Sequence, residues 1–182
     1  MKRTIINVFG SSGSGSTTLA RVIADKYNYH HIDIDDVVWE ETNPPFTLRR
    51  SDLEARDLLL DSLNNYDKIV ISGSLVGFGD DIKHSVDLFV FINLDIQVRL
   101  DRINKRETKR FNERILPGGD LYEKHLEFLR WVSDYETNPE YIRSRKQHLL
   151  WLKDIKVPVL KVTEELSIEE LLLLVKPFLK EF

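Results

Sequence analysis

A run of nine small residues follows the apolar stretch 5–9 and is the part of the chain best suited to chemistry. Its glycines permit a positive φ and leave no Cβ in the way of a ligand. The helix predicted to open near Ser16 would point free N–H groups at an anion. The spacing matches the phosphate-binding loop G-x-x-x-x-G-K-[S/T] with one departure, and it predicts that the run binds a nucleotide phosphate. The residues are Gly10, Ser11, Ser12, Gly13, Ser14, Gly15, Ser16, Thr17 and Thr18.

Ser16 is the departure, because it stands where the pattern has lysine. That lysine reaches the β- and γ-phosphates, whereas serine donates one hydrogen bond and brings no charge. Thr17 occupies the position whose hydroxyl ligates Mg²⁺. A flexible Gly/Ser linker is the alternative interpretation, but apolar residues at helical spacing after the loop favour a packed strand–loop–helix unit. They are Leu19, Val22, Ile23 and Tyr27.

The same glycines also permit a second interpretation, a dinucleotide-binding fold. Acidic residues follow them at about the distance of a ribose-binding acid. The spacing is G-x-x-G-x-G rather than G-x-G-x-x-G, however, and the chain has no Tyr-x-x-x-Lys pair for short-chain dehydrogenase chemistry. The phosphate-binding loop is therefore the favoured interpretation.

Asp33 and Asp35 lie at the end of the next predicted strand, over residues 30–34. Alternation along a strand puts both carboxylates on the same face. We expect Asp33 to hold Mg²⁺ through water and to contact the acceptor, and Asp35 to act as a base or to orient the acceptor. The alternative is a pair of solvated acids in a turn that cap the next helix, which suits the neighbouring Asp36.

A stripe of arginines follows the fourth predicted strand. Their spacing of i, i+3, i+7 and i+11 can place them on one helix face, where guanidinium groups bind phosphate oxygens in pairs. A solvated helix face would look similar, but the stripe leads into a long insertion, which favours function. Arg102 and Arg106 are the expected catalytic cations and could replace the missing lysine. The stripe is Arg99, Arg102, Arg106 and Arg110.

Further candidate residues come from the second and third strand ends. After Pro44-Pro45, Arg49 and Arg56 are expected to bind an anionic acceptor, as is Arg50, although a helix-surface role is equally compatible with their positions. Ser72 stands where many such proteins have a Mg²⁺-organising Asp, and Gly73 would let a ligand approach the backbone. Single aromatic residues can stack on a base or fill the core, and the core is favoured. These are Trp39, Phe46 and Trp131.

The elements that must position these residues alternate between strand and helix. Such alternation predicts one α/β domain with a three-layer fold, in which helices cover both faces of a five-stranded parallel sheet. Ser167 and Glu170 form a capping-box pair that begins the last helix. An insertion over residues 108–153, with two helices over 120–136 and 139–152, is expected to form a helical lid, or else an ordinary packed insertion. The strands are expected at 4–9, 30–34, 68–72, 87–92 and 157–162.

Composition excludes several classes of protein. The chain has 182 residues, no cysteine and a net charge of −4, so disulfides and thiolate metal sites are absent and nothing favours nucleic-acid binding. The N-terminal residues enter a strand at once and no apolar run reaches membrane-spanning length. We therefore expect a cytoplasmic protein with no membrane partner. Its oligomeric state cannot be read from the sequence.

With these residues in place, the chain resembles the small P-loop kinases, the group of adenylate, nucleoside monophosphate and shikimate kinases. The resemblance spans nearly the whole chain and is sharpest at residues 10–18, the Asp33-Ile-Asp35 pair, residues 71–75 and the arginine stripe. Within that group it is similar to adenylate kinase-related proteins that have Ser or Thr at the lysine position, with turns like Trp39-Glu-Glu-Thr-Asn-Pro-Pro-Phe and Leu116-Pro-Gly-Gly. The resemblance implies strand order 2-3-1-4-5 and binding of ATP and Mg²⁺.

Two functions remain open at this stage. One is an ATP-dependent phosphotransferase that acts on a nucleotide, a nucleoside or another small hydroxylated metabolite. The other is a nucleotide-binding regulator or weak ATPase, motivated by the missing lysine. The paired acids and the arginines favour the kinase, because a passive binder needs neither.

Overall fold

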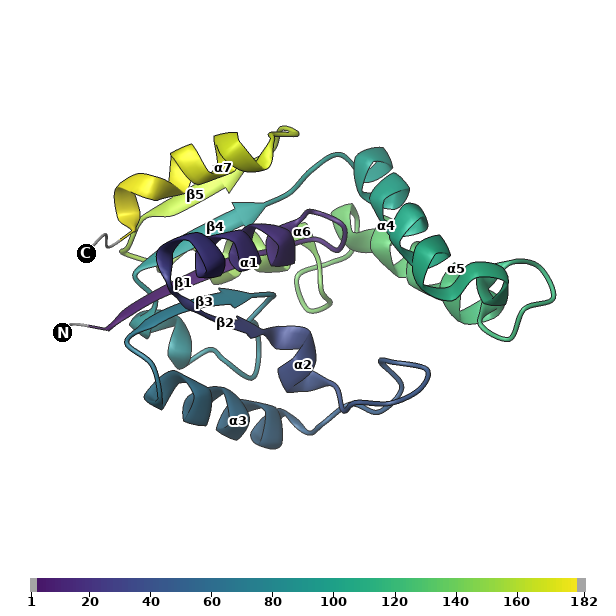
Figure 1. Ribbon diagram of the computed structural model, residues 1–182, viewed down its shortest axis with the longest axis horizontal. Coiled ribbons are helices and arrows are strands. Elements are labelled where there is room, and N and C mark those ends of the chain that lie inside the picture. Colours follow the sequence, from purple (N-terminus) through teal and green to yellow (C-terminus); the bar gives the residue numbers. More distant parts are fainter. Residues whose placement is uncertain (1–2, 180–182) are drawn as a thin grey trace.

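A parallel sheet of five strands forms the centre of the protein, in the order β2-β3-β1-β4-β5 (Figure 1). This order is the predicted one. The computed structural model describes residues 3–179. The strands are β1 (Thr4–Gly10), β2 (His30–Asp33), β3 (Lys68–Ser72), β4 (Leu88–Ile92) and β5 (Val159–Val162). The helices are α1 (Ser16–Tyr27), α2 (Ile34–Val38), α3 (Asp52–Asn64), α4 (Ile96–Phe111), α5 (Tyr122–Ser133), α6 (Arg145–Trp151) and α7 (Ile168–Val175), and the short 3₁₀ turns are η1 (Ile82–Ser85), η2 (Asn112–Ile115), η3 (Asp134–Glu136) and η4 (Lys176–Phe178).

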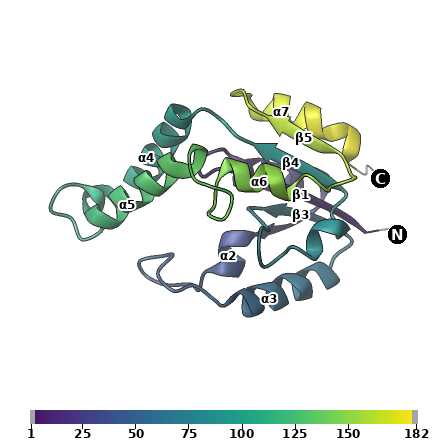
Figure 2. The same ribbon diagram turned by 180° about the vertical axis from the view of Figure 1, so that it is seen from behind.

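Different helices cover the two faces of the sheet (Figures 1 and 2). Side chains alternate along β1, so Ile5 and Phe9 pack in one apolar cluster with α3 and α6. Ile6 and Val8 pack in the other cluster, with α1 and α7. Every residue of β1 is buried. Because both faces are covered, the ends of the strands are the part of the sheet that a ligand can reach.

The strand register brings the predicted polar residues to one edge of the sheet. Ser72 at the end of β3 pairs with Asp33 of β2 on one side and with Val8 of β1 on the other. Gly10, where β1 ends, lies beside Ile92 of β4. All these strands are parallel, so these residues lie at the carboxyl ends of their strands. The phosphate-binding loop and the paired acids therefore share one edge.

The segment between β4 and β5 leaves the sheet and then returns to it. Figure 1 shows α4 and α5 extending beyond the carboxyl edge. The helix predicted over 139–152 is shorter, because Ser144 caps α6 and the chain before it turns. Trp151 at the end of α6 belongs to the core cluster on one sheet face, with Phe9 and Phe89 beside it. Across residues 3–179, none of the helices has both the length and the apolar character that a membrane crossing needs.

Four strand bounds differ from those predicted: β1 ends at Gly10 rather than at residue 9, β4 begins at Leu88 rather than at residue 87, and β2 and β5 are shorter than expected. Strand β2 ends at Asp33 rather than Ile34, because the Asp33 side chain accepts a hydrogen bond from the Asp35 N–H and caps α2. Strand β5 begins at Val159 rather than at residue 157. Pro158 precedes it and supplies only its carbonyl, to the Phe89 N–H, since proline has no N–H to donate.

Ser167 begins α7 with the predicted capping box. Its Oγ accepts from the Glu170 N–H at 3.2 Å, and Glu170 Oε2 accepts from the Ser167 N–H at 2.8 Å. Ser167→Ala is expected to lower the free energy of unfolding by about 1 kcal/mol, measured by urea denaturation. Ser167→Asp keeps a capping oxygen and should match the wild type. Equal loss in both variants would contradict a capping role.

Candidate active site at the carboxyl edge

The loop between β1 and α1 is held in shape by close backbone packing. Gly13 has φ +80°, and a Cβ there would lie 2.7 Å from the Arg99 carbonyl oxygen in α4. A Cβ on Gly10 would lie 1.9 Å from the Ile92 carbonyl oxygen. The Ser14 N–H donates to the Ser11 carbonyl at 3.2 Å and closes the turn. Only glycine is compatible with these contacts at positions 10 and 13.

Unsatisfied polar groups line this loop. Gly15 is the N-cap of α1 and provides no side-chain hydrogen bond, so the N–H groups of the first turn have no side-chain cap. The hydroxyls of Ser11 and Ser14 are buried and have no hydrogen-bond partner. Buried polar groups in folded proteins nearly always have one. The loop therefore has the donors and the dipole of an anion site.

Asp33 and Asp35 lie at the end of β2 in different environments. Asp33 Oδ1 accepts from the Asp35 N–H at 3.2 Å, and its Oδ2 lies 3.9 Å from Nη2 of Arg21. The pKa of Asp35 is raised by desolvation and by the neighbouring Asp33, while Arg143 and Arg106 lower it. Asp33 therefore lies near a cation of α1, whereas Asp35 lies near two cations from the segment between β4 and β5.

Arg102 and Arg106 lie on α4, close to the loop and to Asp35 respectively. Arg102 Nη1 donates to the Ser14 carbonyl at 3.3 Å, and its Nη2 donates to Glu165 at 2.7 Å. Arg106 donates to Glu107 at 3.0 Å and acts electrostatically on Asp35. The structure thus brings both arginines to the predicted edge, each with a carboxylate already beside it. Their catalytic role stays a prediction.

Arg99 does not belong to a phosphate-facing stripe, so the expectation of one shared functional face is wrong for this residue. Its side chain is fully buried and donates to the Leu94 carbonyl at 3.0 Å and to Glu136 at 3.1 Å. A weaker contact of 3.5 Å reaches the Val132 carbonyl. Arg99 therefore ties α4 to the end of α5 and to η3.

Arg110, the last arginine of the stripe, connects α4 to the loop before α3. Its guanidinium lies 5.3 Å from the centre of the Phe46 ring. Phe46 has φ +63° and packs edge-on against Trp39 at 6.1 Å. Trp39 is partly buried against the core, as favoured, whereas Phe46 and Trp131 are exposed. Phe46 is thus contacted by Arg110 from α4 and by Trp39, which follows α2.

The arginines predicted to bind an acceptor have protein partners in this structure. Arg49 pairs with Asp52 at 2.7 Å, and Arg56 pairs with Asp81 at 2.5 Å. Arg50 donates to main-chain carbonyls at the end of α2, among them that of Trp39. Contact of Arg49 and Arg56 with an acceptor stays a prediction.

The end of β3 differs from its expected role in one respect. Gly73 has φ +110°, and a Cβ there would lie 2.7 Å from Cβ of Ile34. Packing against α2 thus accounts for this glycine, and ligand approach stays a prediction. Ser72 Oγ lies 2.9 Å from Nε2 of His31, so the Mg²⁺-organising position of other proteins holds a serine–histidine pair here.

Arg143 is a site residue that the sequence patterns did not indicate. Its Nη2 donates to the carbonyl of Gly10, the first residue of the loop, at 3.4 Å. The guanidinium also lies 5.2 Å from the centre of the Trp131 ring. The sequence offers no local pattern that would single out Arg143 over Arg145. The contact could not be predicted from spacing, because it joins residues 133 positions apart.

A buried chain of hydrogen bonds supports the segment that carries Arg143. The Tyr135 hydroxyl lies 2.7 Å from Nδ1 of His148, and Nε2 of His148 lies 3.1 Å from Oγ of Ser74. Burial and Arg143 lower the pKa of His148 to about 3, so the ring is neutral at physiological pH. These residues join η3 and α6 to the loop after β3.

The predicted Mg²⁺ site consists of Thr17 and Asp33. Their hydroxyl and carboxylate oxygens are the hard donors that Mg²⁺ prefers, together with water and substrate phosphates. Within residues 3–179, no three His, Asp or Glu side chains gather as a metal cluster. Contact of Thr17 and Asp33 with Mg²⁺ stays a prediction.

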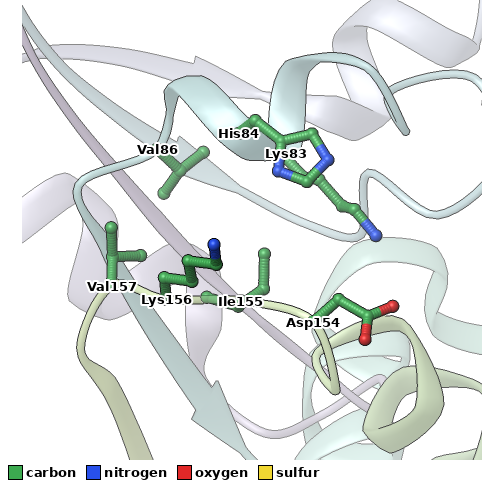
Figure 3. Close-up of a pocket in the computed structure, with 7 residues that line it drawn as sticks. All are labelled: Lys83, His84, Val86, Asp154, Ile155, Lys156 and Val157. Atoms are coloured by element: carbon green, nitrogen blue, oxygen red, sulfur yellow. The ribbon is translucent and has the colours of Figure 1, made fainter.

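A pocket of about 300 Å³ lies elsewhere on the molecule (Figure 3). Val86 and Val157, on its wall, come just before β4 and β5, so the pocket is at the amino ends of these strands. Lys83, His84 and Asp154 also line it. Ligands of parallel sheets bind at the carboxyl ends. The pocket is therefore separate from the candidate site.

Comparisons with known proteins agree with this architecture. No family model matches the chain. A Bacillus subtilis protein named "Uncharacterized protein YqaC" is 35% identical over 170 residues, which cover 93% of each chain. A cytidylate kinase of Haloarcula marismortui is 32% identical over 120 residues, which cover 60% of this chain and 62% of that protein.

Solved structures extend the comparison to the fold. The deoxyadenosine kinase from M. mycoides with bound dATP aligns over 98% of this chain and 100% of its own, with a TM-score of 0.56 and 17% identity. The chain therefore belongs to the family of Bacillus subtilis YqaC and has the fold of the small P-loop kinases.

Proposed function

We propose that the protein is an ATP-dependent phosphotransferase that acts on a nucleotide or another small hydroxylated metabolite. The observation that carries this proposal is the position of Asp35. Its carboxylate has a raised pKa and lies in the field of Arg106 and Arg143, at the same sheet edge as the phosphate-binding loop. A passive nucleotide-binding protein has no need of a base beside two cations.

The proposal assigns a role to each part of the site. Main-chain N–H groups of residues 13–18 and the hydroxyls of Ser11 and Ser14 bind the phosphates of ATP. Arg102 and Arg106 stabilise negative charge on the phosphoryl group during transfer. Thr17 and Asp33 would hold Mg²⁺, which would neutralise phosphate charge. Asp35 accepts the proton of an acceptor hydroxyl, or orients an acceptor phosphate.

The acceptor is proposed as a class. Curated relatives that match part of this chain are a cytidylate kinase and a uridine kinase, and both names describe nucleotide or nucleoside acceptors of those proteins. Asp33 and Gly73, at the ends of β2 and β3, are proposed as acceptor contacts together with Arg49 and Arg56. The segment 108–153, which leaves the sheet beside the loop, is proposed to close over the substrates and exclude water.

A screen of acceptors tests the proposal. Purified protein with ATP and Mg²⁺ should produce ADP only when the correct nucleoside, nucleoside monophosphate or hydroxylated metabolite is added, at about 1–100 s⁻¹. Mass spectrometry should find the acceptor heavier by one phosphoryl group. ADP formed at the same slow rate with every acceptor would overturn the proposal.

One observation favours the second function, a nucleotide-binding regulator or weak ATPase. Ser16 brings no charge to the loop, and the nearby Arg102 is paired with Glu165 at 2.7 Å. If this second function is correct, the protein will bind ATP, but the same screen will yield no phosphorylated acceptor. The presence or absence of that product separates the two functions.

A further inference from the structure

Arg143 is the cation at the loop that is not engaged in an ion pair, although Asp35 acts on it electrostatically from a longer distance. Arg102 is paired with Glu165 and Arg106 with Glu107. Among the residues that the structure describes, Arg143 has no carboxylate within ion-pair distance, and its Nε is buried with no hydrogen-bond partner. The one printed contact of its Nη2 is the long, 3.4 Å bond to the Gly10 carbonyl. The guanidinium therefore retains donors for a further acceptor.

The segment around Arg143 is built to hold it in place. Ser144 is buried, and its Oγ donates to the Pro139 carbonyl at 3.0 Å and accepts from the Gln147 N–H at 3.0 Å. On the other side, Trp131 provides a ring face at 5.2 Å from the guanidinium carbon. Fixing the side chain in advance lowers the entropy that a ligand contact would otherwise cost.

Burying a charged group without a partner is costly. Burial accordingly lowers the pKa of Arg143, although a guanidinium stays protonated in proteins. The cost of burying this cation at a phosphate-binding loop is offset when an anion occupies the loop. Arginine can also bind two phosphate oxygens at once through its planar guanidinium, whereas a lysine ammonium acts as a point charge.

We propose that Arg143 supplies the positive charge that the loop lacks at Ser16, by binding the phosphate oxygens of the nucleoside triphosphate through its free guanidinium donors. This inference rests on the proposed nucleotide site and extends it to a residue 127 positions away in the chain.

Titration of ATP–Mg²⁺ into the protein tests this assignment. Arg143→Ala is expected to weaken binding about 10- to 100-fold, as loss of a hydrogen bond to a charged group implies, and Arg143→Lys to weaken it less. Arg145→Ala is the matched control, because Arg145 is exposed and lies near Glu136 at 3.9 Å. Its affinity should equal that of the wild type.

The double variant Ser16→Lys/Arg143→Ala is the decisive case. Lysine restored at position 16 should recover most of the affinity lost in Arg143→Ala, and inorganic tripolyphosphate used as the probe should show the same order. Unchanged affinity in Arg143→Ala, or no recovery in the double variant while circular dichroism shows native folding, would overturn the inference.

Binding and turnover separate this inference from the proposed function. If no acceptor is phosphorylated but the affinities follow the expected order, Arg143 replaces the lysine in a nucleotide-binding protein and the kinase proposal fails. If an acceptor is turned over and Arg143→Ala binds and reacts as the wild type, the kinase stands and the role of Arg143 is wrong.

Discussion

Asp35→Asn is expected to lower kcat by about 10²- to 10⁴-fold, the contribution that a positioned base makes to proton transfer. The change preserves the shape of the side chain and removes its negative charge. The backbone bonds of Asp35, to Asp33 and to the Trp39 N–H, remain available. Steady-state kinetics with the acceptor found by screening measures this loss. ATP affinity should change little, because the loop rather than Asp35 binds the phosphates.

Folding stability provides the first control for this variant. An acid whose pKa is raised in the folded state binds its proton more tightly there than in the unfolded chain. Ionisation therefore disfavours folding, and stability falls as pH rises through the interval between the two pKa values. Asp35→Asn removes that penalty, so its Tm at neutral pH should equal or exceed that of the wild type. A lower Tm would indicate a structural role instead.

The neighbouring Asp36 provides the second control. It is exposed in the first turn of α2, and Asp36→Asn should retain nearly full kcat. In the wild type, kcat should fall as pH is lowered through the raised pKa of Asp35, and this acid limb should disappear in Asp35→Asn. Equal kcat in the wild type and Asp35→Asn would contradict the assignment of Asp35 as the base.

The parts of the fold that the sequence predicts are those encoded over short distances. The spacing of Gly10, Gly13 and Gly15 after an apolar run describes a strand, a turn and a helix that follow one another directly. Asp33 ends β2 and lies at the carboxyl edge as predicted, but the expected alternation of Asp33 and Asp35 along one strand is wrong, because Asp35 lies in the first turn of α2. The strand order follows from the resemblance to a known fold, which the all-parallel sheet confirms.

The arrangement of charges could not be predicted in the same way. Arg99, Arg102 and Arg106 look alike in the sequence, yet one is fully buried and two lie at the surface near carboxylates. Which face of α4 is buried depends on the packing of α5 and η3, which come later in the chain. The Arg143 contact with Gly10 likewise forms only after α6 has returned to the sheet.

Arg99→Met is expected to lower the free energy of unfolding by about 1–3 kcal/mol, the usual cost of leaving a buried hydrogen-bond acceptor without its donor. Methionine fills similar space but donates no hydrogen bonds. The Leu94 carbonyl would lose a donor at 3.0 Å, and Glu136 would keep only the more distant Arg145. Urea denaturation followed by circular dichroism measures the loss.

Lys105→Met tests whether this cost comes from burial rather than from the loss of a charge on α4. Lys105 is exposed on the same helix, so its replacement should change stability by less than about 0.5 kcal/mol. A loss below about 1 kcal/mol in Arg99→Met would mean that the buried contacts of Arg99 do not anchor the helix.

The anchoring role of Arg99 also has a consequence for nucleotide binding. The backbone of Arg99 lies against Gly13, where an added Cβ would come within 2.7 Å of the Arg99 carbonyl oxygen. The loop is therefore shaped partly by the position of α4, which the buried guanidinium fixes through Glu136. Arg99→Met should weaken ATP binding under conditions where the protein is still folded, although the side chain itself does not reach the loop. Lys105→Met should leave that affinity unchanged, since its side chain has no part in holding α4 against α5.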